Sequence, residues 1–150
     1  IERTSTSSKS GGTITAIYTV LADGDDVTSD PVVDTSRAIL DGHIVLSRDL
    51  AQQGIYPAID VNQSVSRLMT DIVSSEHSKN SQILRKYISK YYENRDLILM
   101  GGYVQGQDPD LDTAIQLWPS IVKFLKQEDG ERASYSESIE ALKSLIGGNK

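Results

Sequence analysis

The residues Ile39 to Arg67, ILDGHIVLSRDLAQQGIYPAIDVNQSVSR, decide how this chain folds. They contain two short apolar runs, His43–Leu46 and Ala58–Val61, separated by a helical turn and a Gly-x-Tyr-Pro corner. The second run is followed by a polar turn that ends in an arginine. This pattern predicts two short strands, with Tyr56 and Arg67 at their ends. Because open α/β sheets bind ligands just outside their strand ends, these two residues are candidate site residues.

The turn between the two runs fixes the direction of the tyrosine. Arg48 and Asp49 begin a helical turn, and Gly54 suits its end because glycine accepts the left-handed conformation common there. Pro57 prevents the helix from continuing. We therefore expect Tyr56 to be held at a sharp corner.

A family resemblance is carried by these same residues. DGHIVLSRDLA (41–51), GIYPAIDV (54–61) and SVSRLM (64–69) resemble the second half of the nucleotide-binding domain of the rotary-type ATPases, most closely the flagellar and type III secretion export ATPases. The run DGHIVLSR and the upstream YTVLADGDD (18–26) favour this branch over the proton-pumping synthases. The resemblance extends from about Gly12 to the C-terminus.

The resemblance implies an α/β fold: the second half of a RecA-like nucleotide-binding domain, with a mostly parallel sheet and helices, followed by a small C-terminal helical bundle. The expected divisions are a flexible loop over 1–12, the C-terminal part of the RecA-like domain over 13–72 and a helical domain over 73–150. Within the second part, TITAIYTVL (13–21) is rich in β-branched and apolar residues, which predicts a central strand covered on both faces.

The resemblance also implies roles for three residues. Tyr56 stacks on the adenine of bound ATP, and Tyr103, between glycines in GGYVQG (101–106), forms the other side of the adenine pocket. Arg67 reaches across a subunit interface to the γ-phosphate bound by the neighbouring subunit, where a planar guanidinium stabilises the transition state. Taken without the family, Tyr56 is an ordinary corner tyrosine, and Arg67 is a surface arginine that pairs with Asp71.

The sequence contains no G-x-x-x-x-G-K-[ST] motif, so no phosphate-binding loop is present in these 150 residues. We interpret the chain, which starts at Ile1, as a fragment that does not hydrolyse ATP alone. The whole protein is expected to be an ATPase that binds ATP and Mg, with the magnesium ligands in the missing N-terminal part. The acidic turn Asp23–Asp26 lacks calcium-loop spacing and is interpreted as solvated, so no metal site is predicted.

Composition excludes several other classes of function. The formal net charge is −6 and the 15 basic residues are scattered, which argues against nucleic acid as a partner. There is no cysteine, so disulfides and thiolate chemistry are excluded. No apolar run is long enough to span a bilayer. These observations are compatible with a cytoplasmic protein.

Beyond Met69 the pattern changes from strands to helices. An apolar face predicts a first helix, and Asp108-Pro109 predicts the start of a second, with Pro119 expected to kink it. Ser134 and Glu137 have the spacing of a capping box and predict the start of the last helix. The residues expected on the buried faces are Ile83, Tyr87, Ile88, Tyr91, Leu111, Ala114, Ile115, Trp118, Val122, Leu125, Ile139, Leu142, Leu145 and Ile146.

Two functions follow from the resemblance. The first is part of the ATPase subunit that energises flagellar or type III protein export in a homohexameric ring, located in the cytoplasm and peripheral at the inner face of the bacterial membrane. FLKQ (124–127) and ASYSESIEAL (133–142) are similar to the flagellar branch. The second is a docking module without catalysis of its own. The partners implied are stator-like and stalk-like export proteins, export chaperone–substrate complexes and the export gate at the membrane.

Overall fold

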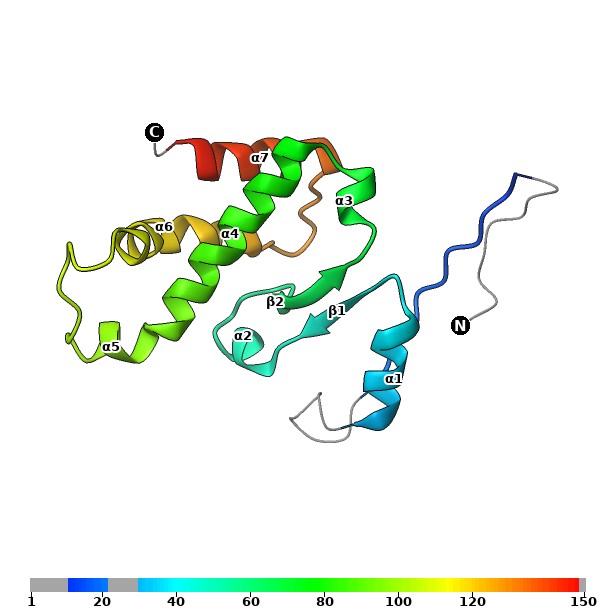
Figure 1. Ribbon diagram of the computed structural model, residues 1–150, viewed down its shortest axis with the longest axis horizontal. Coiled ribbons are helices and arrows are strands. Elements are labelled where there is room, and N and C mark those ends of the chain that lie inside the picture. Colours follow the sequence, from blue (N-terminus) through cyan, green and yellow to red (C-terminus); the bar gives the residue numbers. More distant parts are fainter. Residues whose placement is uncertain (1–10, 22–29, 149–150) are drawn as a thin grey trace. The chain divides into compact units, whose positions relative to one another are not determined.

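The computed structural model describes residues 11–21 and 30–148. The chain divides into two compact units, Ile1–His43 and Ile44–Lys150. The elements of the described residues (Figure 1) are, in order, α1 (Pro31–Ile39), β1 (Gly42–Leu46), α2 (Arg48–Gln52), β2 (Ile59–Ser66), α3 (Met69–Ile72), α4 (Ser75–Glu93), α5 (Arg95–Leu99), α6 (Pro109–Leu125) and α7 (Tyr135–Gly147). The loop predicted for 1–12 and the acidic turn Asp23–Asp26 lie almost wholly outside the described residues.

The first unit holds α1 and the segment 11–21. Asp30 caps α1, because its carboxylate accepts the backbone N–H of Val32 at 2.8 Å. The central strand predicted over 13–21 is wrong for the described chain: those residues hold only an isolated bridge at Thr13, and Ile17 and Leu21 are each 93% exposed. Their composition suits a buried strand, but a central strand also needs hydrogen-bonded neighbours on both sides.

The described residues contain one sheet, in which β1 pairs with β2. The two strands run in opposite directions (Figure 1), and the backbone N–H of Ser47 donates to the carbonyl of Ala58 at 2.8 Å just beyond the pair. Side chains alternate along β1, so that Val45 is buried whereas Ile44 and Leu46 are 71% exposed. The mixture of helices with a small sheet agrees with the expected α/β class. The parallel strands of the expected RecA-like sheet are not among the described residues.

The strand β2 is longer than the apolar run that predicted it. Residues 62–66 were expected to form a polar turn, yet they continue the strand as far as Ser66. Within the strand, the Asp60 carboxylate accepts the backbone N–H groups of Asn62 at 2.9 Å and Gln63 at 3.0 Å. Polar residues are tolerated there because a two-stranded sheet has much of its surface in water.

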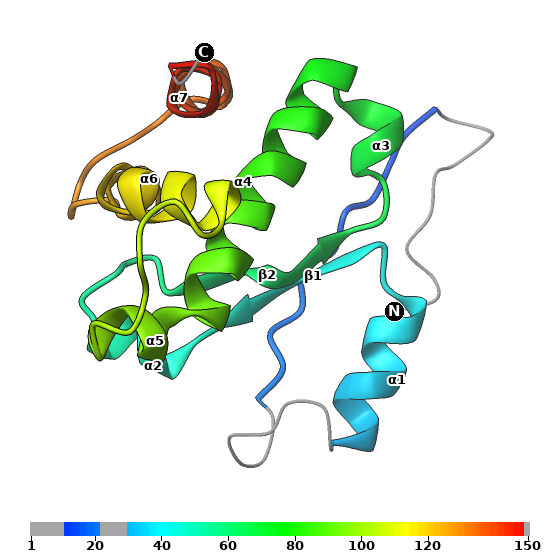
Figure 2. The same ribbon diagram turned by 60° about the vertical axis from the view of Figure 1, so that its left-hand side comes forward.

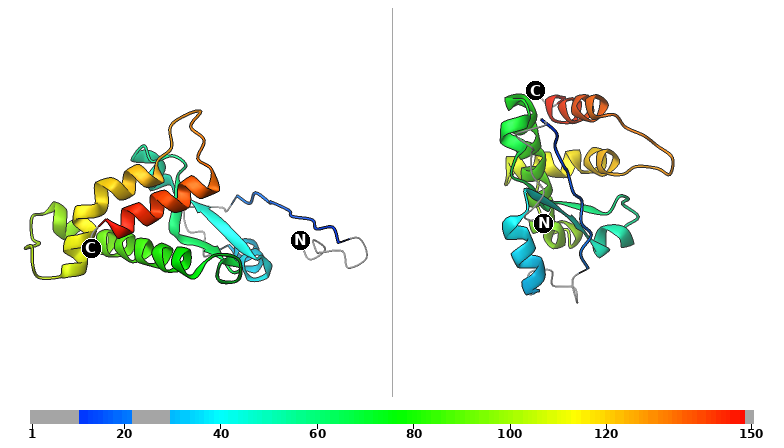
Figure 3. Two further views of the ribbon diagram at one scale, coloured as in Figure 1. Left: turned by 90° about the horizontal axis from the view of Figure 1, so that it is seen from above. Right: turned by 90° about the vertical axis from the view of Figure 1, so that its right-hand side faces the viewer.

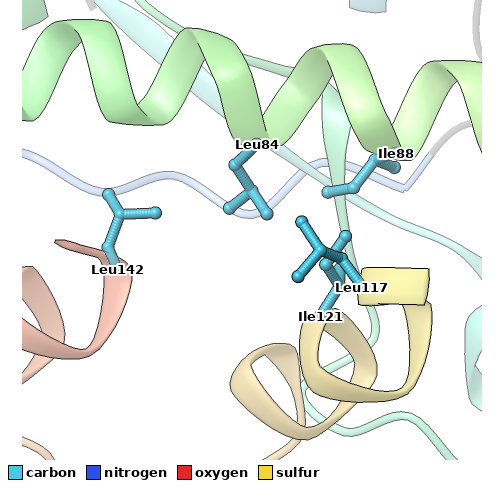
Figure 4. Packing of buried hydrophobic residues seen from close by; sticks show 5 residues of the cluster. All are labelled: Leu84, Ile88, Leu117, Ile121 and Leu142. Carbon is cyan, nitrogen blue, oxygen red and sulfur yellow. The ribbon is translucent and has the colours of Figure 1, made fainter. Parts of the chain in front are cut away.

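The second unit is organised around α4, which packs against α6, α7 and β2 (Figures 2 and 3). Its apolar core contains Leu84 and Ile88 from α4, Leu117 and Ile121 from α6, and Leu142 from α7 (Figure 4). Burial of such side chains contributes roughly 1.5–3 kcal/mol each. This core is what fixes the three helices as a bundle.

The predicted helix starts are confirmed. Asp108 accepts the backbone N–H groups of Asp110 at 2.9 Å and Leu111 at 3.2 Å. The capping box is complete: Ser134 accepts from the N–H of Glu137, and the Glu137 carboxylate accepts from the N–H of Ser134 at 2.7 Å. The helix α6 continues through Pro119 to Leu125.

Polar contacts fasten α4 to the elements on either side of it. The guanidinium of Arg85 donates to the carbonyl of Ser64 in β2 at 2.8 Å, and the amide of Asn62 donates to the Ser89 hydroxyl at 3.0 Å. Lys86 and Lys90 form ion pairs with Asp110 at 2.7 Å and Asp108 at 2.9 Å. The end of β2 and the start of α6 are therefore both held in place by α4.

Candidate functional site

Tyr56 lies at the corner between α2 and β2. Gly54, which ends the turn before it, has a φ of +71°, and the Tyr56–Pro57 peptide is cis. The carbonyl of Tyr56 accepts the backbone N–H of Gln127 at 2.7 Å. The backbone is thus anchored, while the residue remains 56% exposed. An anchored tyrosine with an accessible ring face can stack on a planar ligand.

Arg67 lies at the other end of β2, where the chain turns into α3. It is exposed, and the strand that carries it is fastened to α4 by the hydrogen bond from Arg85 to Ser64. The eight residues of β2 separate Arg67 from the Tyr56 corner by about 25 Å at 3.3 Å per residue. The two predicted site residues are therefore at opposite ends of one strand, and they do not face the same point within this chain.

Tyr103 lies in the loop between α5 and α6. Its hydroxyl donates to the carboxylate of Asp112 at 2.7 Å and accepts the backbone N–H of Asp108 at 3.3 Å. Partial burial raises the pKa of Tyr103, and the hydrogen bond to Asp112 adds to the rise. The hydroxyl is thus used to hold the loop onto the first turn of α6.

The structure does not bring Tyr103 and Tyr56 together. Tyr103 contacts the N-terminal end of α6, whereas Tyr56 contacts Gln127, just after its C-terminal end. The 17 residues of α6 span about 25 Å at 1.5 Å per residue. The two tyrosines were expected to form the two sides of one pocket, and within this chain they lie at opposite ends of α6. The sequence places GGYVQG just before the start of α6, but it did not show that Tyr56 meets the other end of that helix.

The segment that does lie against the Tyr56 corner is the turn after α6. Besides the bond from Gln127 to Tyr56, the side chain of Gln127 donates to the carbonyl of Glu131 at 3.1 Å, and the N–H of Glu128 donates to the Glu131 carboxylate at 2.9 Å. Lys126 pairs with Glu128 at 3.3 Å. The sequence pointed to FLKQ (124–127) only through its similarity to the flagellar branch, because nothing in its composition indicates a contact with a residue 71 positions earlier.

An aromatic cluster joins α4 and α6. Tyr91 stacks on Trp118 with ring centroids 3.8 Å apart and planes 6° apart, and Tyr92 meets the same indole edge-on at 5.3 Å. Burial raises the pKa of Tyr92, with Arg95 acting in the opposite direction. These rings pack the outer end of the bundle, so they are better explained as structure than as a ligand site.

The described residues contain neither a cluster of metal ligands nor a membrane-spanning helix. Across 11–21 and 30–148, no group of three or more His, Cys, Asp or Glu residues is arranged to hold a metal ion. No helix in that part of the chain is long and apolar enough to cross a bilayer.

Two protein families match this chain. The T3SS EscN ATPase C-terminal domain matches residues 73–144, and the nucleotide-binding domain of the ATP synthase alpha/beta family matches residues 1–66. The flagellum-specific ATP synthase of Salmonella typhimurium is 49% identical over 142 residues, which are 95% of this chain and 31% of that protein. The chain belongs to the family of flagellar and type III secretion ATPases.

Other members of this ATPase family are similar to the same extent. The flagellum-specific ATP synthase of Bacillus subtilis is 48% identical over 136 residues, 91% of this chain and 31% of that protein. The assembled ATPase EscN of enteropathogenic E. coli has a TM-score of 0.86 and 44% identity, covering 91% of this chain and 33% of EscN. EscN in complex with its central stalk EscO has a TM-score of 0.85 and 41% identity, and the match covers 97% of this chain and 34% of EscN. The chain spans about a third of the length of these relatives.

Proposed function

We propose that this chain supplies the adenine contact and a trans arginine finger to an ATPase subunit that energises flagellar or type III protein export in a homohexameric ring. The placement of Tyr56 and Arg67 at opposite ends of β2, about 25 Å apart, carries this proposal. One strand then serves two nucleotide sites: Tyr56 the site of its own subunit, and Arg67 that of the neighbour. Membership of the ATPase family is the reason to propose ATP as the nucleotide and its hydrolysis as the reaction.

Tyr56 fits the adenine role by its combination of a fixed backbone and an open ring. Stacking of a base on an aromatic side chain contributes about 1–3 kcal/mol, provided that the ring does not have to be ordered first. The bond from Gln127 orders the Tyr56 corner in advance. The adenine pocket that we propose therefore consists of Tyr56 and the turn around Gln127, and Tyr103 acts instead as the anchor of the α5–α6 loop.

Arg67 fits the finger role by its exposure at the end of a braced strand. A guanidinium stabilises charge on the transferred phosphoryl oxygens, and fingers of this kind raise turnover by roughly 10³–10⁵ in other NTPases. That effect requires accurate placement, which the contacts of Arg85 with Ser64 and of Ser89 with Asn62 in β2 support.

The remaining parts of the proposal concern the whole protein. ATP would be bound with Mg, and the phosphate loop and magnesium ligands would lie in the portion of the relatives that this chain does not match. We place the protein in the cytoplasm, peripheral at the inner face of the bacterial membrane. Its proposed partners are stalk-like and stator-like proteins, chaperone–substrate complexes and the export gate. The complex of the relative EscN with its central stalk EscO supports the stalk-like partner.

The trans role of Arg67 is tested by mixing subunits of the complete protein. Arg67→Ala rings are expected to bind ATP and to lose at least roughly a thousandfold in phosphate release. Rings mixed with a second inactive variant, altered in the phosphate-loop lysine, are expected to regain activity, because some interfaces then combine an intact loop with an intact finger. Arg132→Ala, in the exposed α6–α7 linker, is the matched control. Normal turnover of Arg67→Ala, or no recovery on mixing, would refute the trans finger.

A second candidate is a docking module with no catalysis of its own. It is favoured by exposed apolar side chains around the α5–α6 loop: Leu99 is 70% exposed, Met100 79% and Val104 60%. Under this proposal, replacing Met100 with Asp abolishes binding of a stalk-like partner in a pull-down while phosphate release stays unchanged. Loss of both together would instead assign the loop to assembly of the ring.

A further inference from the structure

An open groove of about 280 Å³ lies between β2, α3 and the three helices of the bundle. Its apolar walls include Val61, Leu84, Leu125 and Leu142, which belong to or pack against the bundle core. An apolar cavity of about 150 Å³ accepts a benzene molecule, so a groove of this size has room for a phenylalanine or leucine side chain. Neither Tyr56 nor Arg67 lines this groove.

The polar residues of the groove give it a positive character. Arg85 lines it, and the bond to the Ser64 carbonyl at 2.8 Å uses one of the five N–H donors of the guanidinium and holds it in place. His77 also lines it, with its Nδ1 atom 3.5 Å from the Tyr135 hydroxyl. Among the described residues that line the groove there is no Asp or Glu.

Two acidic side chains, Glu76 of α4 and Glu140 of α7, line a smaller hollow beside the groove and not the groove itself. The Glu76 carboxylate is paired with Lys143 of α7 at 3.1 Å, and Glu140 also interacts electrostatically with Lys143. An ion pair between two exposed side chains has little net field at a distance. Among the described residues that line the groove itself, Arg85 is the one that carries a formal charge.

We propose that this groove docks an acidic segment of a partner protein, by taking one large apolar side chain of that segment and pairing Arg85 with an adjacent carboxylate. The apolar walls provide the affinity, and the fixed guanidinium provides the orientation. A basic segment is disfavoured because its charge would face Arg85 without compensation.

The test uses the isotope-labelled chain and three short synthetic peptides. The first carries one Phe flanked by Glu residues, the second replaces Glu with Gln, and the third replaces Phe with Ala. We expect the first peptide to shift the amide NMR signals of Val61, Leu84 and Leu142, and the other two to bind roughly tenfold more weakly. Equal binding of the Glu and Gln peptides, or shifts elsewhere only, would overturn the proposal.

Substitutions in the chain locate the binding site. Ser138→Phe fills the groove from α7 and should abolish the shifts, whereas Ser136→Phe, on the exposed side of α7, should not. Arg85→Gln should weaken binding roughly tenfold, and Lys123→Gln, which removes a charge outside the groove, should have no effect. If Ser138→Phe fails to fold, as judged by Trp118 fluorescence, Ser138→Leu replaces it. Binding that survives every groove variant would refute the site.

Discussion

Replacing Ile121 with alanine should destabilise the bundle more than any surface change of the same type. Ile121 has no exposed surface and lies at the centre of the core formed by α4, α6 and α7. Large-to-alanine substitutions in cores cost about 2–5 kcal/mol, and a site enclosed by three helices cannot collapse freely to fill the cavity. We therefore expect a loss of about 3–4 kcal/mol in the free energy of unfolding.

The measurement is urea denaturation followed by the fluorescence of Trp118, the single tryptophan of the chain. Trp118 stacks on Tyr91 beside the same core, so its emission reports on the bundle. With a slope of about 2 kcal/mol per molar urea, the midpoint should fall by roughly 1.5–2 M. The control is Ile72→Ala, which removes the same atoms from a residue that is 74% exposed and should cost less than about 0.5 kcal/mol. Equal shifts for the two variants would show that α6 does not form the core.

Two further changes test the loop and the last helix. Gly101 has a φ of +68°, so Gly101→Ala should lower the free energy of unfolding, measured by urea denaturation, by about 1–2 kcal/mol. Gly102→Ala should lower it less, because the new methyl group meets only the flexible end of the Leu97 side chain, at 2.8 Å. Equal losses for the two variants would contradict this reasoning. The hydrogen bond from the Ser134 N–H lowers the pKa of Glu137 below its ordinary value of 4.5. The unfolded chain thus binds this proton more readily, so the stabilisation is present above about pH 4.5 and is lost as the pH falls through the folded pKa. Glu137→Gln should flatten the acid branch of the stability curve, and an unchanged branch would show that the capping box is not formed in solution.

The local signals in the sequence predicted the helix starts well. Asp108-Pro109 and the Ser134–Glu137 spacing depend only on residues three positions apart, and the capping contacts are within that range. The face of α4 was predicted less accurately. Ile83, Tyr87 and Ile88 were expected on the buried face, and Ile88 is buried while Tyr87 packs against the core. Leu84, which was not expected there, is buried, whereas Ile83 is only partly buried. Because β2, α6 and α7 all pack against α4, a wider part of its surface is buried than the apolar pattern of that one helix indicates.

The long-range contacts were not predictable from the sequence. The positions of Tyr56 and Arg67 at the two ends of β2 follow from local patterns and were expected. The contact of Tyr56 with Gln127 depends instead on how α6 crosses the bundle, so the separation of Tyr103 from Tyr56 came only with the structure. Similarly, the composition of 13–21 indicates that its side chains suit a buried strand. It does not indicate whether neighbouring strands are present to pair with it.

The hydrogen bond between Gln127 and Tyr56 has a mechanical consequence. The helix α6 is attached at its far end to α4 through Asp108 and Lys90, and at its near end to the Tyr56 corner. A rigid rod held at both ends transmits force along its axis. A load applied at the α5–α6 loop therefore reaches the backbone of the Tyr56 corner about 25 Å away, unless the bond to Gln127 breaks first.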